Sequence, residues 1–422
     1  MRQKENNGEL HLGKGYFKAL SPSGGGWSVE RVTAAVVLYN NAELIPGLSA
    51  TIQGLSPAGA VIYDSCSSDG SAEKACKMIS DAAVITGDNL GFGNGCNRCL
   101  EKIDTEYTLF LNSDASITRE NLALLVAALD ENSCLAAVQP VIRLWGWELV
   151  TAGRGVYLTP FGESWDAGFM HLEPFIKGGI REVPAVTAAV ALWRTSVLKK
   201  LGGFDTGYFM YFEDADLSLR ARGAGWKVAL CGGSQAAHMV GASAVREKAE
   251  LWELASSIRL QRRFLRGSGL SERSLWSREL RIAAGMLLRG ISPFARIKTF
   301  LKALAAPAPE EIALDRHTKS ILYGIPGDMP LRRPEQGAPG PGWQRGRAAP
   351  WAGLKPHRKP LKLALTGESH ASTAAVVSGS GELLRRVTVS PSKTVEVTLA
   401  EPPGIVYIKC DSLSDSIKVE VK

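Results

Sequence analysis

Apolar and polar residues alternate in two rhythms along the chain, and the first covers residues 31–238. Here short apolar runs are separated by stretches in which apolar residues recur at helical spacing. Strands that alternate with helices need right-handed crossovers, so this region predicts an α/β domain with a doubly wound, mostly parallel sheet. The predicted strands are 33–38, 60–63, 82–86, 107–111 and 135–138, and the predicted helices are 42–54, 71–80, 93–103 and 119–131.

The second rhythm begins at residue 361, where apolar and polar residues alternate with a period of two. Short strands separated by turn residues are typical of a small β-sandwich, which we expect over residues 361–422. Its predicted strands are 361–365, 374–378, 383–389, 394–399, 406–410 and 416–421.

Three further segments complete the predicted organisation around the main domain, residues 31–245. Residues 1–30 are polar and glycine-rich at their end, and we interpret them as a flexible lead-in. Residues 246–305 have helical spacing. Residues 306–360 are rich in Pro, Gly and Arg and are interpreted as a linker, apart from a short helical pattern near 310–322.

The positive charge of the chain is concentrated in two regions. The net charge is +7, yet residues 251–300 hold ten Lys/Arg against three Glu, and residues 331–360 hold seven basic residues against one acidic. Such a concentration predicts an anionic partner. No recognised nucleic-acid motif is present, so a basic amphipathic helix on anionic lipid is favoured for 246–300, with a solvated charged helix as the alternative.

The remaining composition is that of a globular protein in a reducing compartment. Hydrophobic residues make up 45% of the 422 residues and charged residues 22%. No run of about 18 apolar residues could span a membrane, and the polar start of the chain is unlike a secretory signal. We therefore expect a cytoplasmic protein whose seven cysteines are free thiols, with Cys96 and Cys99 as small helix residues and no metal or redox role.

Polar residues follow four successive predicted strands. Because ligands of open α/β sheets bind beyond the carboxyl ends of the strands, these residues predict one polar pocket. Each also has a structural explanation as turn residue, helix cap or tight-turn glycine. Taken together they fit a nucleotide-diphosphate site, in which a carboxylate binds a base or ribose edge, backbone amides bind phosphate and a second carboxylate holds a divalent cation. The segments are Tyr39-Asn40-Asn41, residues 64–71, residues 88–95 and Asn112-Ser113-Asp114.

An ordered series of motifs runs through these segments and continues downstream. They are Val36-Val37-Leu38-Tyr39-Asn40, residues 64–71, residues 89–97 (Asn-Leu-Gly-Phe-Gly-Asn-Gly-Cys-Asn), Leu111-Asn112-Ser113-Asp114, Gly202-Gly203-Phe204-Asp205, residues 209–217, Arg220, Gly225-Trp226, His238 and Gly241-Ala242-Ser243. Each motif alone is weak, but the combination over residues 31–265 resembles bacterial family-two glycosyltransferases of the rhamnosyltransferase-like subgroup.

The resemblance implies an A-type glycosyltransferase fold and sugar transfer with inversion from a nucleotide-sugar donor, with dTDP- or UDP-sugars favoured. It implies that Asp64 contacts the nucleobase, that Asp114 holds Mg²⁺ or Mn²⁺ on the diphosphate, and that Asp214 is the catalytic base. Thr187-Ala188-Ala189 departs from the Gly-Ala pair usual in the family, which leaves the sugar open. The residues assigned to the nucleotide-sugar site are Tyr39, Asn40, Asp64, Asp69, Asn89, Gly91, Phe92, Gly93, Asn97, Asn112 and Arg220.

The chemistry of inversion requires a base and a means of stabilising the leaving group. A carboxylate within hydrogen-bond reach can take the proton of the acceptor hydroxyl, and Asp214 and Glu213 are the two candidates. His238 is a candidate second metal ligand, and imidazole suits Mn²⁺ better than Mg²⁺. Arg220 binds either phosphate or a nearby acid such as Asp216.

The leading hypothesis is a hexosyltransferase that builds a bacterial surface glycan on a glycan or lipid-linked acceptor, on the inner face of the cell membrane. One alternative is a nucleotidyl-transfer enzyme, although residues 39–43 lack the glycine- and arginine-rich phosphate loop typical of that class. Another is a non-catalytic glycan-binding protein with a relic transferase domain, which Asp114 and Asp214 disfavour. The acceptor, linkage and oligomeric state are not predicted.

Overall fold

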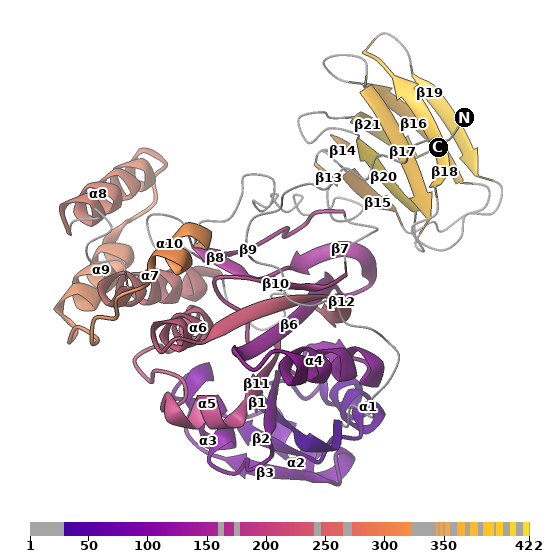
Figure 1. The fold of residues 1–422 in the computed structure, drawn as a ribbon. Helices are drawn as coiled ribbons and strands as arrows, with labels where there is room; N and C mark the ends of the chain where they lie inside the picture. The colour runs from indigo at the N-terminus through magenta and orange to yellow at the C-terminus, as the bar shows by residue number, and fades with distance from the viewer. Residues whose placement is uncertain are drawn as a thin grey trace, which may run out of the picture.

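The structure is a computed structural model of the chain (Figure 1). It describes residues 29–158, 164–172, 178–239, 246–264 and 272–322, and the strands between residues 343 and 421. The predicted lead-in up to residue 28 lies outside the described residues, as do Gly241-Ala242-Ser243 of the family resemblance.

The main domain is built on a mixed, mostly parallel sheet, as predicted. Strands β3, β2, β1, β4, β6 and β12 run in one direction, and β11 and β10 run against them. In the sheet order, the strands are β3 (Ala82–Thr86), β2 (Gly59–Asp64), β1 (Val32–Leu38), β4 (Tyr107–Leu111), β11 (Val190–Arg194), β6 (Leu135–Leu144), β12 (Lys227–His238) and β10 (Ile180–Glu182). The antiparallel β11 lies between β4 and β6 and therefore joins two parallel halves.

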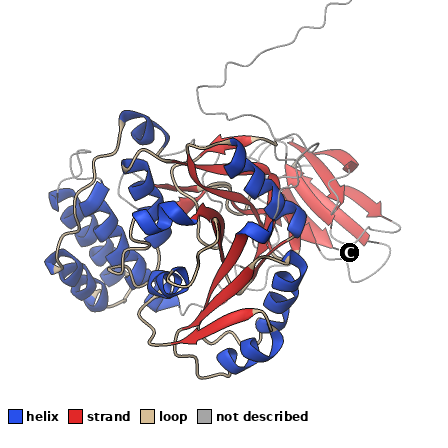
Figure 2. Ribbon diagram, turned by 60° about the horizontal axis from the view of Figure 1, so that its bottom comes forward, coloured by secondary structure: helices blue, strands red, loops and turns tan. Residues whose placement is uncertain are grey.

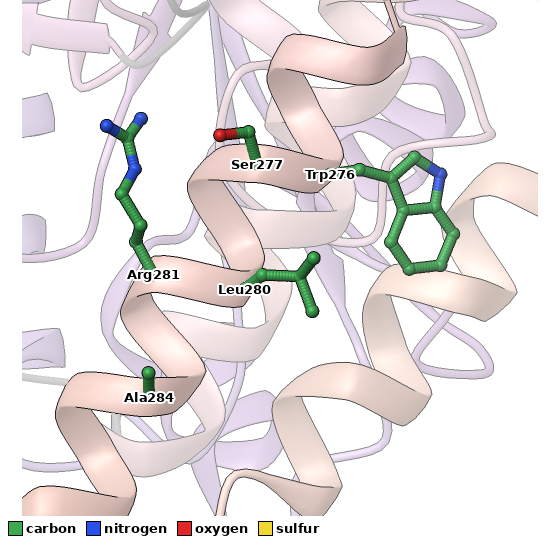
Figure 3. Close-up of a pocket in the computed structure, with 5 residues that line it drawn as sticks. All are labelled: Trp276, Ser277, Leu280, Arg281 and Ala284. Carbon is green, nitrogen blue, oxygen red and sulfur yellow. The ribbon is translucent and has the colours of Figure 1, made fainter.

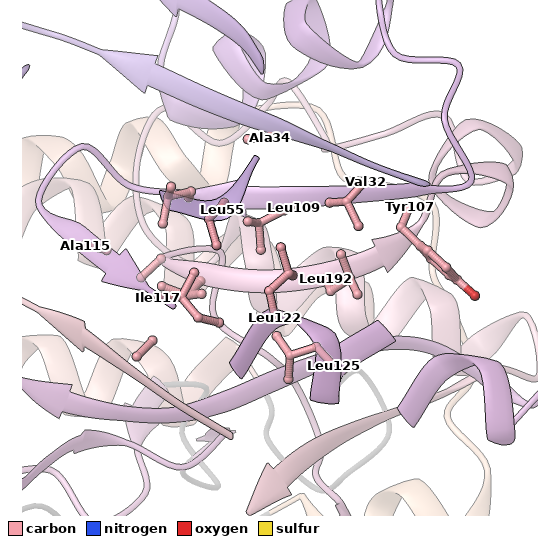
Figure 4. Packing of buried hydrophobic residues seen from close by; sticks show 14 of the residues in the cluster. Val32, Ala34, Leu55, Tyr107, Leu109, Ala115, Ile117, Leu122, Leu125 and Leu192 are labelled. Atoms are coloured by element: carbon pink, nitrogen blue, oxygen red, sulfur yellow. The ribbon is translucent and has the colours of Figure 1, made fainter. Parts of the chain in front are cut away.

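Helices cover both faces of this sheet (Figure 2). Side chains of β1 alternate between the faces: Val32, Ala34 and Val36 enter one core, and Ala35 enters the other. The first core also takes α1 (Ile45–Leu55), α2 (Ser71–Met78) and α4 (Arg119–Glu131) (Figure 4). The second takes α3 (Phe92–Leu100), α5 (Thr195–Lys200) and α6 (Glu213–Gly223). All four predicted helices of this region are confirmed, α4 with its predicted ends and the other three with shifted ends.

Several strands of this domain were not predicted, and three of them, with three residues each, are too short to show a period. Strand β5 (Ala115–Ile117) pairs with β12, and β7 (Trp147–Gly153) pairs with β6. After β7 the chain forms a two-stranded ribbon of β8 (Val156–Leu158) and β9 (Ser164–Asp166).

The predicted helical region 246–305 consists of three helices with different surroundings. The helices are α7 (Arg246–Phe264), α8 (Glu272–Leu288) and α9 (Phe294–Ala305), and a short α10 (Arg316–Ile321) follows. Helix α7 belongs to the main domain, because Arg259 pairs with Asp205 at 2.8 Å and Arg263 pairs with Asp216 at 2.6 Å. Two of its arginines therefore neutralise acids of the main domain, the buried Asp216 and the partly buried Asp205.

The C-terminal region is an antiparallel β-sandwich, which confirms the predicted fold and all six predicted strands. Apolar side chains of both sheets form its core, including Leu363, Leu365, Val376, Val397 and Ile408. The six strands are β16 (Leu361–Gly367), β17 (Ser372–Ser378), β18 (Leu383–Val389), β19 (Val395–Leu399), β20 (Val406–Cys410) and β21 (Ile417–Val421).

The start of the sandwich was predicted wrongly. Residues assigned to the linker form β13 (Trp343–Gln344), β14 (Arg347–Ala348) and β15 (Trp351–Leu354). Strand β14 pairs with β21, and β15 pairs with β20. The Pro- and Gly-rich sequence does not indicate strands here, because partners more than fifty residues away stabilise them. The sandwich also touches the main domain, where Ala375 is buried with Leu149, Val150 and Leu172.

The described residues contain neither a membrane-spanning helix nor a disulfide. Among them, no helix has both the length and the apolar character that a membrane crossing requires. Six cysteines are free thiols, as predicted; Cys96 and Cys99 are buried in α3, and the Cys99 thiol lies 3.5 Å from the carbonyl oxygen of Val36.

Candidate active site

The carboxyl ends of β4 and β12 bring Asp114 and His238 together. The two residues are 124 positions apart, yet Asp114 Oδ1 lies 3.0 Å from His238 Nε2. Strand β5, which begins at residue 115, pairs His238 with Ala115 and so fixes this approach. The backbone N–H of Met239 also donates to the carbonyl of Asp114 at 3.0 Å. The sequence assigned both side chains to one metal site, and the structure makes them neighbours.

The pair fits a divalent cation. Two ligands at about 2.1 Å from a metal, in adjacent octahedral positions, are about 3 Å apart, which is the spacing found here. In the parts of the chain that the structure describes, no group of three or more His, Cys, Asp and Glu side chains is arranged to hold a metal ion. The protein would thus supply two ligands and leave the others to diphosphate oxygens and water, as hard cations such as Mg²⁺ and Mn²⁺ often require.

Asn112 lies on the same edge with an unused acceptor. Its Nδ2 is 3.5 Å from His238 Nε2, while its buried Oδ1 has no hydrogen-bond partner among the described residues. Asp64, at the end of β2 and 2% exposed, is similar: Oδ1 accepts from the backbone N–H of Ser67 at 2.9 Å, and buried Oδ2 has no partner there. Buried acceptors without donors are uncommon, so a donor from a ligand would satisfy both.

The loops after β1 and β2 are bound to each other. The Asn40 side chain accepts from the backbone N–H of Ser68 at 2.9 Å, and Asn40 itself has a positive φ of 53°. Asp69 accepts from the backbone of Ala42 at 2.9 Å and from the hydroxyl of Ser71 at 2.5 Å. Asp69 therefore orients the start of α2 and connects it to the first loop. This agrees with the structural alternative given above, in which the residue acts as a turn residue or helix cap. Tyr39 is 47% exposed beside this junction.

The glycines after β3 are explained by close packing. Gly91 has a φ of 100°, and a Cβ there would lie 2.2 Å from the carbonyl oxygen of Phe209. The backbone N–H of Phe92 donates to that same oxygen at 3.0 Å, and a Cβ at Gly93 would meet Phe204 at 3.0 Å. This motif thus holds α3 against residues 204–209. Asn89 accepts from the N–H of Gly91 at 3.3 Å within the same turn.

Two predicted donor-binding residues have a different role in the structure. Asn97 uses both halves of its amide on the backbone of Phe204, at 2.9 and 2.8 Å. Arg220 pairs with Asp216 at 2.7 Å and donates to the carbonyls of Leu201 and Gly203. Binding of Arg220 to a nearby acid, one of the two predicted possibilities, is therefore what the structure shows, and both residues position α6 and its preceding segment.

The two candidate bases lie at the first turn of α6 in different surroundings. Asp214 Oδ2 accepts from the backbone N–H of Ala188 at 3.1 Å, and Oδ1 accepts from that of Ala215 at 2.7 Å. Glu213 is 6% exposed, and its Oε2 is buried without a partner among the described residues. Burial raises the pKa of both carboxyls, and burial with the adjacent charge of Asp214 raises the pKa of Glu213 to about 8.

Residues 187–189 connect the candidate base to the candidate metal pair. Ala188 donates to Asp214, and the backbone N–H of Asn112 donates to the carbonyl of Ala189 at 2.9 Å. The Thr187 hydroxyl also binds Asp214. Two hydrogen bonds therefore bridge the acid of α6 and the residue at the end of β4, although these lie a hundred positions apart. This connection is the main geometric result for the site.

Asp166 is a site residue that sequence reasoning missed. Strand β9 places it beside β7, where a Cβ on Gly153 would lie 3.2 Å from Asp166 Oδ1. Its register partner Val156 is buried with Ala215, next to Asp214. Burial, then the negative charge of Asp214, raises the pKa of Asp166 to about 7. It stands in a three-residue strand outside any motif, so only the fold reveals it.

Comparison with known proteins agrees with these motifs. Residues 33–178 match the family model for glycosyl transferase family 2. The N-acetylglucosaminyl-diphospho-decaprenol L-rhamnosyltransferases of two Mycobacterium tuberculosis strains are 26% identical over 196 residues, 40% of this chain and 62% of theirs. The low-salt glycan biosynthesis hexosyltransferase Agl10 of Haloferax volcanii is 23% identical over 199 residues, 46% of this chain and 62% of its own. The matches thus span less than two thirds of these relatives.

Solved structures include similar but distant chains. GalNAc-T7 with UDP, GalNAc and Mn²⁺ has a TM-score of 0.45 at 15% identity, covering 55% of this chain and 47% of that one. The mannosyltransferase PcManGT of Pyrobaculum calidifontis with GDP-Man and Mn²⁺ has a TM-score of 0.41 at 19% identity, covering 55% and 62%. The family match is thus confined to residues 33–178, and the relatives that the chain resembles over this part include a rhamnosyltransferase and a hexosyltransferase.

Proposed function

We propose that the protein is an inverting glycosyltransferase that moves a hexosyl group, with rhamnose as the leading candidate, from a nucleoside-diphosphate donor to a hydroxyl acceptor. The observation that carries the proposal is the hydrogen-bonded connection from Asp214 through residues 187–189 to Asn112, beside the pair of Asp114 and His238. A base and a diphosphate-binding edge on one site are what a single displacement at the anomeric carbon requires.

Asp214 is the better candidate for the base. Its carboxyl is only partly buried, whereas Glu213 is almost fully buried with a pKa of about 8 and so keeps its proton at neutral pH. The N–H groups of Ala188 and Ala215 fix the Asp214 carboxylate in one orientation. Because burial raises its pKa, Asp214 is a stronger base than an exposed aspartate and accepts the acceptor proton more readily as the new glycosidic bond forms.

The leaving nucleoside diphosphate gains negative charge at the other end of the site. Asp114 Oδ1 and His238 Nε2 would hold Mg²⁺ or Mn²⁺ there, and the ion would supply Lewis-acid stabilisation of the diphosphate. Binding would require the imidazole to release the proton that it shares with Asp114, since both atoms must then offer lone pairs. The imidazole ligand favours Mn²⁺ over Mg²⁺.

The nucleoside would lie against the ends of β1 and β2. The unsatisfied Oδ2 of Asp64 is an acceptor for an N–H of a pyrimidine base or a ribose hydroxyl, which fits a UDP- or dTDP-sugar. Tyr39, exposed beside it, offers an aromatic face. The acceptor class that we propose is a lipid-linked glycan of the inner membrane face, because the Mycobacterium tuberculosis relatives are named for N-acetylglucosaminyl-diphospho-decaprenol.

A donor screen tests the proposal. The full chain is incubated with dTDP-rhamnose, UDP-sugars and GDP-sugars, and release of the nucleoside diphosphate is followed with Mn²⁺, with Mg²⁺ and with chelator. We expect release from one nucleotide class, dependent on the divalent ion and accelerated by an acceptor. Donor binding without any turnover in the presence of lipid-linked acceptors would instead support a relic transferase domain that binds glycans.

A further inference from the structure

An apolar surface is exposed at the turn between α8 and α9. Four large side chains there are between half and almost fully exposed: Leu287 at 63%, Leu288 at 89%, Ile291 at 49% and Phe294 at 70%. We call residues 287–294 the hairpin tip. Single exposed apolar residues are common on ordinary protein surfaces. A contiguous group of large ones usually marks a binding surface.

The exposure does not arise from a poorly packed hairpin. On the opposite side, Leu275 of α8 and Phe300 of α9 are buried with Leu254 and Ile258 of α7. The Trp276 and Phe300 rings meet edge to face at 4.8 Å between centroids. Arg296 forms a bidentate pair with Glu279 at 2.7 and 3.1 Å, which joins the two helices. The hairpin is therefore held in place while its tip remains uncovered by the described residues.

Cations lie along the same two helices. Residues 272–305 carry seven Lys/Arg and two Glu, one of which Arg296 neutralises. Arg281, Lys298 and Lys302 are exposed, and no ion pair between described residues involves them. Along α8, Trp276, Leu280 and Arg281 line an open hollow of about 700 Å³, with Ser277 and Ala284 (Figure 3). Apolar side chains among unpaired cations match the chemistry of an anionic lipid surface.

We propose that the hairpin tip docks the protein on a membrane surface that contains anionic lipids. Leu287, Leu288, Ile291 and Phe294 enter the boundary between head groups and acyl chains, while the cations contact lipid phosphates. A second copy of the chain is a poorer occupant, because a symmetric contact would place two equally cationic hairpins against each other.

Helix α7 links this surface to the candidate site. Its Trp252 packs on Phe209 at 5.1 Å between ring centroids, and the Ser256 hydroxyl donates to the carbonyl of Met210 at 2.9 Å. Phe209 and Met210 precede the candidate base by a few residues. The purpose of docking, access to a lipid-linked acceptor, rests on the proposed function, whereas docking itself does not.

Vesicle flotation with the full chain tests the docking. Vesicles of phosphatidylcholine with about 30 mol% phosphatidylglycerol are compared with pure phosphatidylcholine, between about 0.1 and 0.5 M salt. We expect flotation only with anionic vesicles and a decline as salt rises. The double variant Leu288→Ser, Phe294→Ser should weaken binding by about tenfold or more. The triple variant Arg281→Gln, Lys298→Gln, Lys302→Gln should lose the salt dependence along with most binding.

Matched controls separate the tip from general surface effects. Met78→Ser removes an apolar side chain that is 37% exposed on α2, and it should float like the unaltered chain. Light scattering gives the oligomeric state of each variant. Equal binding to pure phosphatidylcholine, no binding, or a dimer that the tip variants convert to monomer with unchanged flotation would overturn the proposal. The donor screen is independent, so loss of turnover with intact flotation would instead reject the proposed function.

Discussion

The substitution Asp214→Asn tests the assignment of the base most directly. Asparagine keeps the shape of the side chain but cannot accept the acceptor proton. Both carboxylate oxygens of Asp214 accept from backbone N–H groups, those of Ala188 and Ala215. In asparagine one of these positions is an amide NH₂, which faces an N–H donor and cannot replace that hydrogen bond.

The expected effects on stability and on turnover differ in size. One buried donor left without its acceptor costs about 1–3 kcal/mol of unfolding free energy. Loss of general-base catalysis lowers kcat by about 10²–10⁴-fold, which corresponds to about 2.7–5.5 kcal/mol of activation free energy. The KM for the donor should change little, because the nucleotide is assigned to the strand ends and not to this carboxyl.

Glu213→Gln is the matched control. With a pKa of about 8, Glu213 is protonated at neutral pH, and glutamine resembles that neutral form. We expect its kcat to fall by less than about tenfold. The two variants therefore remove adjacent carboxyls, of which only the partly buried Asp214 is ionised in the working enzyme.

The assay is steady-state release of nucleoside diphosphate by both variants across a pH range. Since burial raises the pKa of Asp214, the kcat/KM of the unaltered enzyme should fall with decreasing pH at values above those of an ordinary aspartate. This acid limb should vanish in Asp214→Asn. Near-normal turnover of Asp214→Asn combined with a large loss in Glu213→Gln would reverse the roles, and normal turnover of both would refute the mechanism.

Three further outcomes follow from the structure. Asp114→Asn and His238→Gln should each weaken Mn²⁺-dependent binding of a nucleoside diphosphate in calorimetry, with binding in chelator unchanged; equal affinity in Mn²⁺ would contradict the metal site. With its pKa raised to about 7, Asp166 carries a proton over the acid limb, so Asp166→Asn should leave that limb of kcat/KM in place; a limb that moves to lower pH would show that Asp166 is ionised there. Deleting residues 343–422 should leave a soluble domain that unfolds cooperatively. A chain that lacks only residues 361–422 should aggregate, because β14 and β15 then lose their partners β21 and β20. Size-exclusion chromatography and calorimetry distinguish these results.

The sequence by itself determined the elements that have long, regular patterns. The strands 82–86 and 107–111 and the helix 119–131 were predicted with their observed ends, because burial on one face leaves a clear period in the residues. All six strands of the sandwich were also predicted, two of them, 383–389 and 406–410, with their observed ends. The family resemblance also assigned Asp114, His238 and Asp214 to one site, and the ends of β4 and β12 do bring Asp114 and His238 together.

Only the tertiary structure decided which residues act on a ligand and which act on the protein. Asn97, Arg220 and the glycine at position 91 carry family motifs, yet their contacts are with the segment 201–209, which the sequence shows to be remote. Asp166 and residues 187–189 have no pattern of their own, and their proximity to Asp214 arises from pairing across more than twenty positions.

The basic helices give the same lesson in terms of charge. A count of residues 251–300 cannot tell arginines that neutralise buried acids from cations that remain exposed. Arg259 and Arg263 of α7 pair with Asp205 and Asp216, whereas Arg281, Lys298 and Lys302 are exposed on the hairpin that carries the apolar tip. The sequence sets the number of charges, but long-range packing sets their partners, because an ion pair forms only where the fold brings the acid.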